Sequence, residues 1–218
     1  FFLYLPFNAV HNPLDPPEKY IAPFAPMKDE KRRKFAAMLT ALDSGVGSIL
    51  GKLNEHDLTN NTLVIFISDN GGPTAQTTSN NGPLRGFKTQ VLEGGIRVPF
   101  MIQWPGHIRP DQAYSEPVIS LDILPTIVAA AGGELVASDK CDGSDLVPYL
   151  ALNDSKPHNA LFWRQGENFA IRSGKFKFVK QTGEPLALYD LSQDIHEDHN
   201  LIAQMPDKAN ELQSVWNQ

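Results

Sequence analysis

The sequence predicts an α/β protein with a mostly parallel sheet flanked by helices, followed by a small antiparallel subdomain with one helix. Residues 62–68 form a continuous apolar and β-branched run, which is typical of a central strand covered on both faces. Residues 98–104 form a second apolar run, which ends at a Pro-Gly turn. From about Asp29 to Glu55, apolar residues recur at the spacing of one buried helix face. Strands and helices in alternation indicate a sheet covered by helices.

The first element is an apolar run at residues 1–7, Phe-Phe-Leu-Tyr-Leu-Pro-Phe, which predicts a buried strand. The run has no initiator Met, no basic region and no cleavage-site pattern, so we do not interpret it as a signal peptide. A buried strand at the first residue leads us to expect a fragment that begins inside a domain. Such a fragment would expose apolar surface and unpaired strand edges, through which it could pair with another chain.

The later elements follow from capping residues and turns. Asp122 opens a short helix, for which it is a candidate N-cap, and the Gly-Gly pair at 132–133 ends that helix. Farther on, short apolar runs alternate with glycine-containing turns, which predicts an antiparallel meander followed by a helix at about 206–216. We therefore divide the chain into residues 1–153, the C-terminal part of an α/β domain, and residues 154–218, a small antiparallel subdomain.

Composition excludes several classes of protein. The 218 residues are 41% hydrophobic, which argues against a disordered chain. The net charge of −6 argues against a nucleic-acid partner, since phosphate binding needs a basic face. The chain has no apolar run of the roughly 18–20 residues that a membrane span needs. Its single cysteine, Cys141, excludes an internal disulfide framework and a cysteine-rich zinc site.

Asp69 and Asn70 directly follow the most apolar strand and precede a Gly-Gly pair. Ligands of open α/β sheets bind beyond the carboxyl ends of the strands, where these two residues are expected. A carboxylate and an amide offer the hard oxygen ligands that Ca²⁺ and Mg²⁺ prefer. The alternative is a plain Asp-Asn-Gly turn after a strand.

Three further side chains could act on an anion. His11 follows the first predicted strand and could donate a proton or bind an oxyanion next to Asp69 if the two strands are neighbours. The alternative is a loop histidine fixed by the following proline. Lys88 suits a sulfate or phosphate oxygen as a point charge. Arg85 could bind the same anion through two hydrogen bonds, or it could be a structural ion-pair partner.

Together these segments resemble the type I, formylglycine-dependent sulfatases of the alkaline phosphatase superfamily, and arylsulfatases in particular. The matching segments occur in the order of the family: residues 6–14 (PFNAVHNPL), 68–72 (SDNGG), 84–88 (LRGFK), 93–99 (EGGIRVP), 122–126 (DILPT), 188–191 (LYDL) and 197–201 (EDHNL). The resemblance covers nearly the whole chain. It implies an alkaline-phosphatase-like fold and the hydrolysis of a sulfate monoester to an alcohol and sulfate.

The resemblance also implies roles for individual residues. Asp69 and Asn70 would ligate Ca²⁺, with Mg²⁺ as the alternative ion. Lys88 would contact a sulfate oxygen, and His11 would hydrogen-bond the sulfate and protonate the departing alcohol. Arg85 is a lesser candidate for substrate binding. The family's nucleophile, a hydrated formylglycine made from a Cys or Ser within a Cys/Ser-x-Pro-x-Arg motif, has no counterpart here and is expected only in the missing N-terminal part.

Two other functions fit the same residues. One is a phosphomonoester or phosphonate hydrolase of the same superfamily. The other is a non-catalytic protein that binds sulfated glycans. The expected partner is a glycan or aryl sulfate ester, and the resemblance implies a periplasmic, secreted or lysosomal location.

Overall fold

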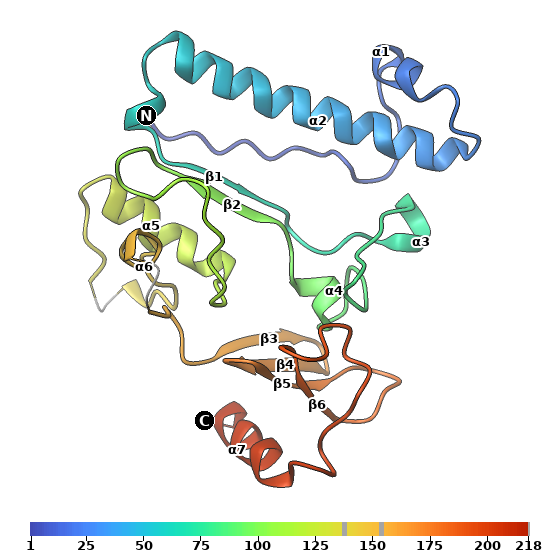
Figure 1. Ribbon diagram of the computed structural model, residues 1–218, viewed down its shortest axis with the longest axis vertical. Coiled ribbons are helices and arrows are strands. Elements are labelled where there is room, and N and C mark those ends of the chain that lie inside the picture. The colour runs from blue at the N-terminus through green and yellow to red at the C-terminus, as the bar shows by residue number, and fades with distance from the viewer. Residues whose placement is uncertain (137–138, 153–154, 218) are drawn as a thin grey trace. The chain divides into compact units, whose positions relative to one another are not determined.

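The computed structural model divides the chain into two compact units (Figure 1). The structure describes residues 1–136, 139–152 and 155–217. The first unit contains Phe1–Thr59 and Gly72–Gly82, and the second contains Asn60–Gly71 and Pro83–Gln218. The domain boundary expected at residues 153 and 154 lies outside the described residues, so that division stays a prediction.

The first unit is built around the long helix α2 (Glu30–Glu55). Asp29 caps this helix, because its carboxylate accepts a 3.0 Å hydrogen bond from the backbone N–H of Arg32. The side chains of Phe35 and Ala37 are buried. The long helix predicted from apolar periodicity is therefore confirmed. The other helical segments of this unit are short: α1 (Glu18–Ile21), the 3₁₀ turn η1 (Ala22–Phe24) and α3 (Thr74–Thr77).

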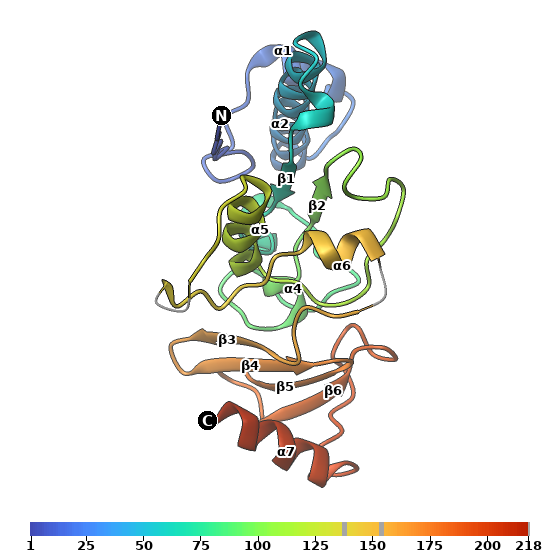
Figure 2. The same cartoon turned by 90° about the vertical axis from the view of Figure 1, so that its left-hand side faces the viewer.

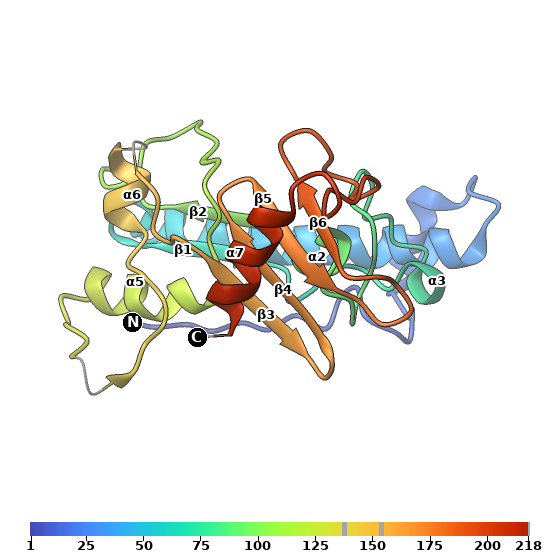
Figure 3. The same cartoon turned by 90° about the horizontal axis from the view of Figure 1, so that it is seen from below.

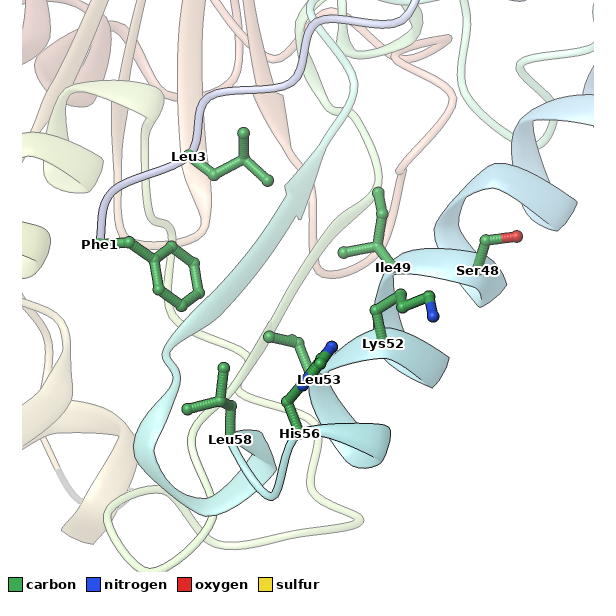
Figure 4. Close-up of a pocket in the computed structure, with 8 residues that line it drawn as sticks. All are labelled: Phe1, Leu3, Ser48, Ile49, Lys52, Leu53, His56 and Leu58. Carbon is green, nitrogen blue, oxygen red and sulfur yellow. The ribbon is translucent and has the colours of Figure 1, made fainter.

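The strand predicted at residues 1–7 does not form, and this prediction is wrong. These residues have no regular secondary structure, and Phe1 is 86% exposed. A strand needs a hydrogen-bonded neighbour, and none of the strands in the described part of the chain pairs with this segment. The side chains of Phe1 and Leu3 instead line an open apolar pocket beside the end of α2, together with Ser48, Ile49, Lys52, Leu53, His56 and Leu58 (Figure 4).

The second unit begins with a two-stranded sheet made of β1 (Val64–Ile67) and β2 (Phe100–Gln103). Both strands lie inside the predicted apolar runs. They pair with each other in antiparallel register, with Val64 opposite Gln103 and Ile67 opposite Phe100. The expectation of a parallel sheet is therefore wrong for this pair. An apolar run indicates that a strand is buried, but it carries no information on the direction in which the neighbouring strand runs.

Asp122 anchors the helical part of the second unit, although not as predicted. Its buried carboxylate does not cap α5 (Ile123–Ala130). One carboxylate oxygen instead accepts from the N–H of Ile119 at 2.8 Å, and the other accepts from the N–H of Ser144 at 2.9 Å and from the ring of His158 at 2.8 Å. Asp122 thus joins three segments that are distant in the sequence. The remaining short helical elements are the 3₁₀ turns η2 (Thr59–Asn61), which precedes β1, and η3 (Ser120–Asp122), which leads into α5, and the helix α6 (Val147–Leu152).

The C-terminal meander is confirmed as a four-stranded antiparallel sheet in the order β3-β4-β5-β6. Its strands are β3 (Leu161–Gln165), β4 (Asn168–Ser173), β5 (Phe176–Lys180) and β6 (Ala187–Asp190). Positive φ angles at Gly166, Gly174 and Gly183 allow the tight turns between the strands.

Both faces of this sheet are covered. Helix α7 (Pro206–Trp216) lies along one face, as Figures 1 and 2 show, and crosses the strands in Figure 3. Its Leu212 packs in the core formed with the sheet, and the helix predicted at about 206–216 is confirmed. Val91 and Leu92, which precede the short helix α4 (Glu93–Ile96), pack on the other face. The sheet therefore touches the segment that leads into α4. None of the helices in the described ranges has the length and apolarity to cross a bilayer.

Candidate functional site

The backbone of residues 68–71, directly after β1, is fixed to the segment that contains α4. The N–H of Ser68 donates to the carbonyl oxygen of Pro99 at 3.1 Å. The N–H of Gly71 donates to the carbonyl oxygen of Gly95 at 2.9 Å. These two bonds bracket Asp69 and Asn70, so both candidate metal ligands lie on a backbone that is held at either end.

The side chains of Asp69 and Asn70 offer oxygen atoms suited to a hard cation. Asp69 is exposed, and within the described part of the chain no group hydrogen-bonds its carboxylate. The Nδ2 of Asn70 donates to the carbonyl oxygen of Gly71 at 3.0 Å, so this hydrogen bond uses the amide nitrogen and not the oxygen Oδ1. The pair therefore fits two of the roughly 6–8 oxygen positions around Ca²⁺. Among the described residues, no group of three or more His, Cys, Asp or Glu residues is placed to hold a metal ion.

Three backbone segments meet beneath these residues because each carries glycine at the point of contact. A Cβ atom on Gly71 would lie 1.7 Å from the carbonyl oxygen of Gly94. A Cβ atom on Gly94 would lie 2.4 Å from the carbonyl oxygen of Gly86, and one on Gly95 would lie 2.1 Å from that of Gln90. Carbon and oxygen atoms cannot approach so closely. The glycines therefore place the Asp69–Asn70 loop and the Arg85–Lys88 turn on one framework.

The two candidate cations of this turn have different surroundings. Arg85 donates from Nη1 to both carboxylate oxygens of Glu184 at 3.0 Å, and from Nη2 to the hydroxyl of Tyr189 at 3.2 Å. Burial opposes the charge of Arg85, but the hydrogen bond and the charge of Glu184 outweigh it and raise the pKa of the guanidinium. This geometry favours the structural ion pair, and a substrate role for Arg85 stays a prediction. Lys88 is half-buried in the same turn, which is closed by a 3.0 Å bond from the N–H of Gln90 to the carbonyl oxygen of Phe87.

His11 belongs to the first compact unit, whereas the other four candidates belong to the second. Its ring Nδ1 lies 2.8 Å from the carbonyl oxygen of Asn12, and its backbone N–H donates to the carbonyl oxygen of Asn8 at 2.8 Å. The imidazole is exposed. The expected convergence of His11 with Asp69 and Lys88 stays a prediction.

Sequence reasoning missed a cluster of charged residues buried beside the site. The ammonium of Lys177 lies 2.9 Å from Oε1 of Glu93 and 2.9 Å from Oε1 of Glu197, and all three side chains are almost completely buried. One signal was available. Lys177 stands in the apolar strand β5, on the same side of the strand as the buried Val179. A lysine at such an inward position needs a buried partner of opposite charge.

Two family models match the chain. The model described as Sulfatase matches residues 1–133, and the model described as N-sulphoglucosamine sulphohydrolase, C-terminal, matches residues 87–217. The chain therefore belongs to the sulfatase family. The family and the alkaline-phosphatase-like α/β fold predicted from the sequence are both confirmed.

Individual relatives agree with this assignment. Arylsulfatase A of Bos taurus is 35% identical over 215 residues, which are 84% of this chain and 42% of the relative. Arylsulfatase A of Homo sapiens is 33% identical over 232 residues, covering 93% of this chain and 44% of the relative. The crystal structure of Ps i-CgsB in complex with k-i-k-neocarrahexaose superimposes with a TM-score of 0.86 at 32% identity, covering 93% of this chain and 46% of that one. The chain thus spans less than half the length of these relatives.

Proposed function

We propose that the full-length protein hydrolyses sulfate monoesters, and that this chain supplies part of the active site. The observation that carries the proposal is the glycine-lined framework on which the Asp69–Asn70 loop and the Lys88 turn meet. Membership of the sulfatase family supports the reaction class. The relatives extend well beyond the matched region, so the remainder of the active site belongs to the rest of the protein.

Each candidate residue of this chain has a separate role in the proposed reaction. Asp69 and Asn70 would hold Ca²⁺, or Mg²⁺, through a carboxylate and an amide oxygen, and the bound ion would supply positive charge that stabilises the sulfate oxygens. Lys88 places its ammonium against a sulfate oxygen, and His11 donates the proton that the departing alcohol oxygen takes up. The hydrated formylglycine that the family uses would be the nucleophile, and its place would be in the rest of the protein. Arg85 keeps the turn that carries Lys88 in place through Glu184.

This set of groups suits the charge changes of the reaction. A sulfate monoester carries one negative charge, and breaking its S–O bond moves negative charge onto the leaving oxygen. Fixed positive groups around the sulfate oxygens stabilise that change because they need no reorganisation at the moment of reaction. A proton donor on the leaving side removes the charge that accumulates there.

The proposed substrates are sulfated glycans or aryl sulfates. Two relatives are named arylsulfatase A, and a solved relative was crystallised with a neocarrahexaose. From the resemblance to the sulfatase family, we propose a periplasmic, secreted or lysosomal location.

The test uses the full-length protein and measures sulfate released from an aryl sulfate and from a sulfated oligosaccharide. Mass spectrometry of the Cys/Ser-x-Pro-x-Arg peptide detects formylglycine in the same sample. Sulfate release with formylglycine present is the expected result. Faster hydrolysis of a phosphate ester without formylglycine would instead establish a phosphomonoester or phosphonate hydrolase. Binding of a sulfated glycan with no hydrolysis would establish a non-catalytic binding protein.

A further inference from the structure

Five charged residues of the second unit form one connected cluster, which we call the Lys177 cluster and define as Glu93, Arg97, Arg172, Lys177 and Glu197. Glu93, Lys177 and Glu197 are buried, Arg172 is half-buried and Arg97 is exposed. Lys177 pairs with both carboxylates at 2.9 Å. The second oxygen of Glu93 lies 3.6 Å from Arg97 and 3.7 Å from Arg172. Burial raises the pKa of Glu93, but the charges of Lys177, Arg172 and Arg97 outweigh burial and lower it overall. The cluster joins α4 to strands β4 and β5 and to the loop after β6.

Stability alone is a weak reason for such a cluster. Buried ion pairs lose their hydration, and apolar residues of similar volume often stabilise a protein as well or better. Lys177 lies opposite Arg172 and Tyr189 in the neighbouring strands, and the next residues along this face are apolar: Ala170, Val179 and Ala187. An apolar side chain at position 177 would extend that core. We therefore ask which segments the ion pairs and hydrogen bonds of the cluster hold in place.

The cluster holds the first residue of α4 by its backbone and by its side chain. The carboxylate of Glu197 accepts a 2.7 Å hydrogen bond from the N–H of Glu93, one of the N–H groups that a helix leaves without an internal partner. The side chain of Glu93 pairs with Lys177. Glu197 itself has a φ of 63°, which a residue other than glycine rarely adopts. This strained backbone aims its carboxylate at the start of α4.

The next two residues of α4 touch the candidate site. The N–H of Gly94 donates to the carbonyl oxygen of Arg85 at 2.6 Å, and the carbonyl oxygen of Gly95 accepts from Gly71, the residue after Asn70. Backbone packs on backbone at both contacts, with no flexible side chain between them. A shift of Glu93 must therefore move the residues that carry the proposed metal ligands and the proposed sulfate-binding lysine.

We propose that Glu93, Lys177 and Glu197 are positioning residues that fix the proposed metal- and sulfate-binding loops from the C-terminal sheet. The structural part of this proposal is independent of the reaction, whereas its kinetic part rests on the proposed function. None of the three residues is assigned contact with substrate. Their effect passes through Glu93 to Gly94 and Gly95, and from there to Arg85 and Gly71.

The first test measures amide hydrogen exchange in the full-length protein, resolved at Gly71 and Gly94. Glu197→Ala removes the acceptor for the Glu93 N–H, and Lys177→Met removes the central charge at similar volume. Both should speed exchange at Gly71 and Gly94 at least tenfold. Glu197→Gln keeps a carbonyl acceptor and should restore slow exchange. If Lys177→Met does not fold, the two Glu197 variants alone decide the outcome.

Leu212→Ala is the matched control, because Leu212 is buried on the opposite face of the same sheet. This variant should lower Tm without speeding exchange at Gly71. Equal exchange at Gly71 in Leu212→Ala and Glu197→Ala, at equal loss of Tm, would show a merely structural role and overturn the proposal. So would unchanged exchange in Glu197→Ala.

The kinetic part is measured on an aryl sulfate. Glu197→Ala should lower kcat/KM about tenfold, and Glu197→Gln should recover it. Exchange that responds as expected, in a protein that releases no sulfate, would retain the positioning role and reject the proposed function. Unchanged exchange in a protein that does release sulfate would reject the positioning role and retain the proposed function.

Discussion

Four polar side chains in the second unit sit on backbone that has almost no freedom to move. Asp69 and Asn70 lie between two backbone hydrogen bonds, and the Arg85–Lys88 turn is fixed by Gly94 and by the ion pair to Glu184. A ligand or an oxyanion contact acts best when it is held before the substrate arrives. The rigid backbone contacts, more than the identities of the four side chains, indicate that these loops form a binding site.

Lys88→Ala in the full-length protein should lower kcat/KM for an aryl sulfate by about 10²-fold or more, as for other contacts to a developing oxyanion. Steady-state kinetics measures this change. Lys156→Ala removes an exposed lysine of the same unit and should leave the kinetics unchanged. Equal kinetics for the two variants would remove Lys88 from the site.

Asp69→Ala should weaken Ca²⁺ binding by the full-length protein by roughly tenfold or more, because a carboxylate ligand supplies both an oxygen and a negative charge. Isothermal titration calorimetry measures the change without reference to activity. Asp142→Ala, which removes an exposed carboxylate of the same unit, should bind Ca²⁺ as the unaltered protein does. Undiminished affinity in Asp69→Ala would show that the metal lies elsewhere.

The elements of the molecule show where sequence patterns carry information and where they do not. Helix α2, the meander β3–β6 and helix α7 follow from local periodicity and turn residues, and all three were predicted. The strand expected at residues 1–7 failed because a strand depends on a partner that a local pattern cannot reveal. The antiparallel pairing of β1 with β2 was missed for the same reason. Asp69, Asn70 and Lys88 could be identified from sequence motifs. The ion pair between Lys177 and Glu93 could not, because the two residues are far apart in the sequence and meet only in the folded protein.

The glycine contacts at α4 give a prediction on stability and activity together. Gly71→Ala would place a methyl group 1.7 Å from a carbonyl oxygen, so the backbone must move apart. We expect a lower Tm and a loss of sulfate release in the full-length protein. Gly47→Ala is the matched control, because Gly47 lies in α2 with open space around its Cβ position. It should raise stability by about 0.5–1 kcal/mol, since alanine favours a helix more than glycine does. Thermal unfolding of both variants decides the matter.

Within the Lys177 cluster, Glu93 gives the free energy of unfolding a defined dependence on pH. The pKa of Glu93 is lowered in the folded state, so its contribution is fully present above the ordinary value of 4.5 and is lost as the pH falls through the lower folded value. Glu93→Gln should therefore flatten the loss of stability between about pH 5 and pH 3. Urea unfolding at several pH values measures the slope. An unchanged slope in the variant would show that Glu93 does not contribute to acid unfolding.

At the scale of the whole molecule, large apolar side chains remain exposed near the N-terminus. Phe1, Phe2 and Tyr4 are each at least 75% exposed, which is unusual for three neighbouring aromatic residues. They are suited to being covered by another part of the polypeptide or by another chain. The relatives, of which this chain spans less than half, contain further polypeptide.

The 218-residue chain expressed alone should therefore self-associate or bind a hydrophobic dye strongly. Replacing Phe2 and Tyr4 by serine should weaken both effects, because it removes apolar surface without touching the second unit. Light scattering and dye fluorescence measure them. A monodisperse chain that binds no dye would contradict this reading of the exposed residues.

The packing of Val91 and Leu92 on the C-terminal sheet limits how that sheet can be exchanged between relatives. A chimera that carried strands β3–β6 of a relative after α6 would need an apolar surface on that sheet to pack against these two side chains. Grafts chosen only for the strands and for α7 would match one side of the sheet and leave the other mismatched. The C-terminal sheet is therefore not a detachable module, and engineering of its inner surface will alter the loops that carry Asp69 and Lys88.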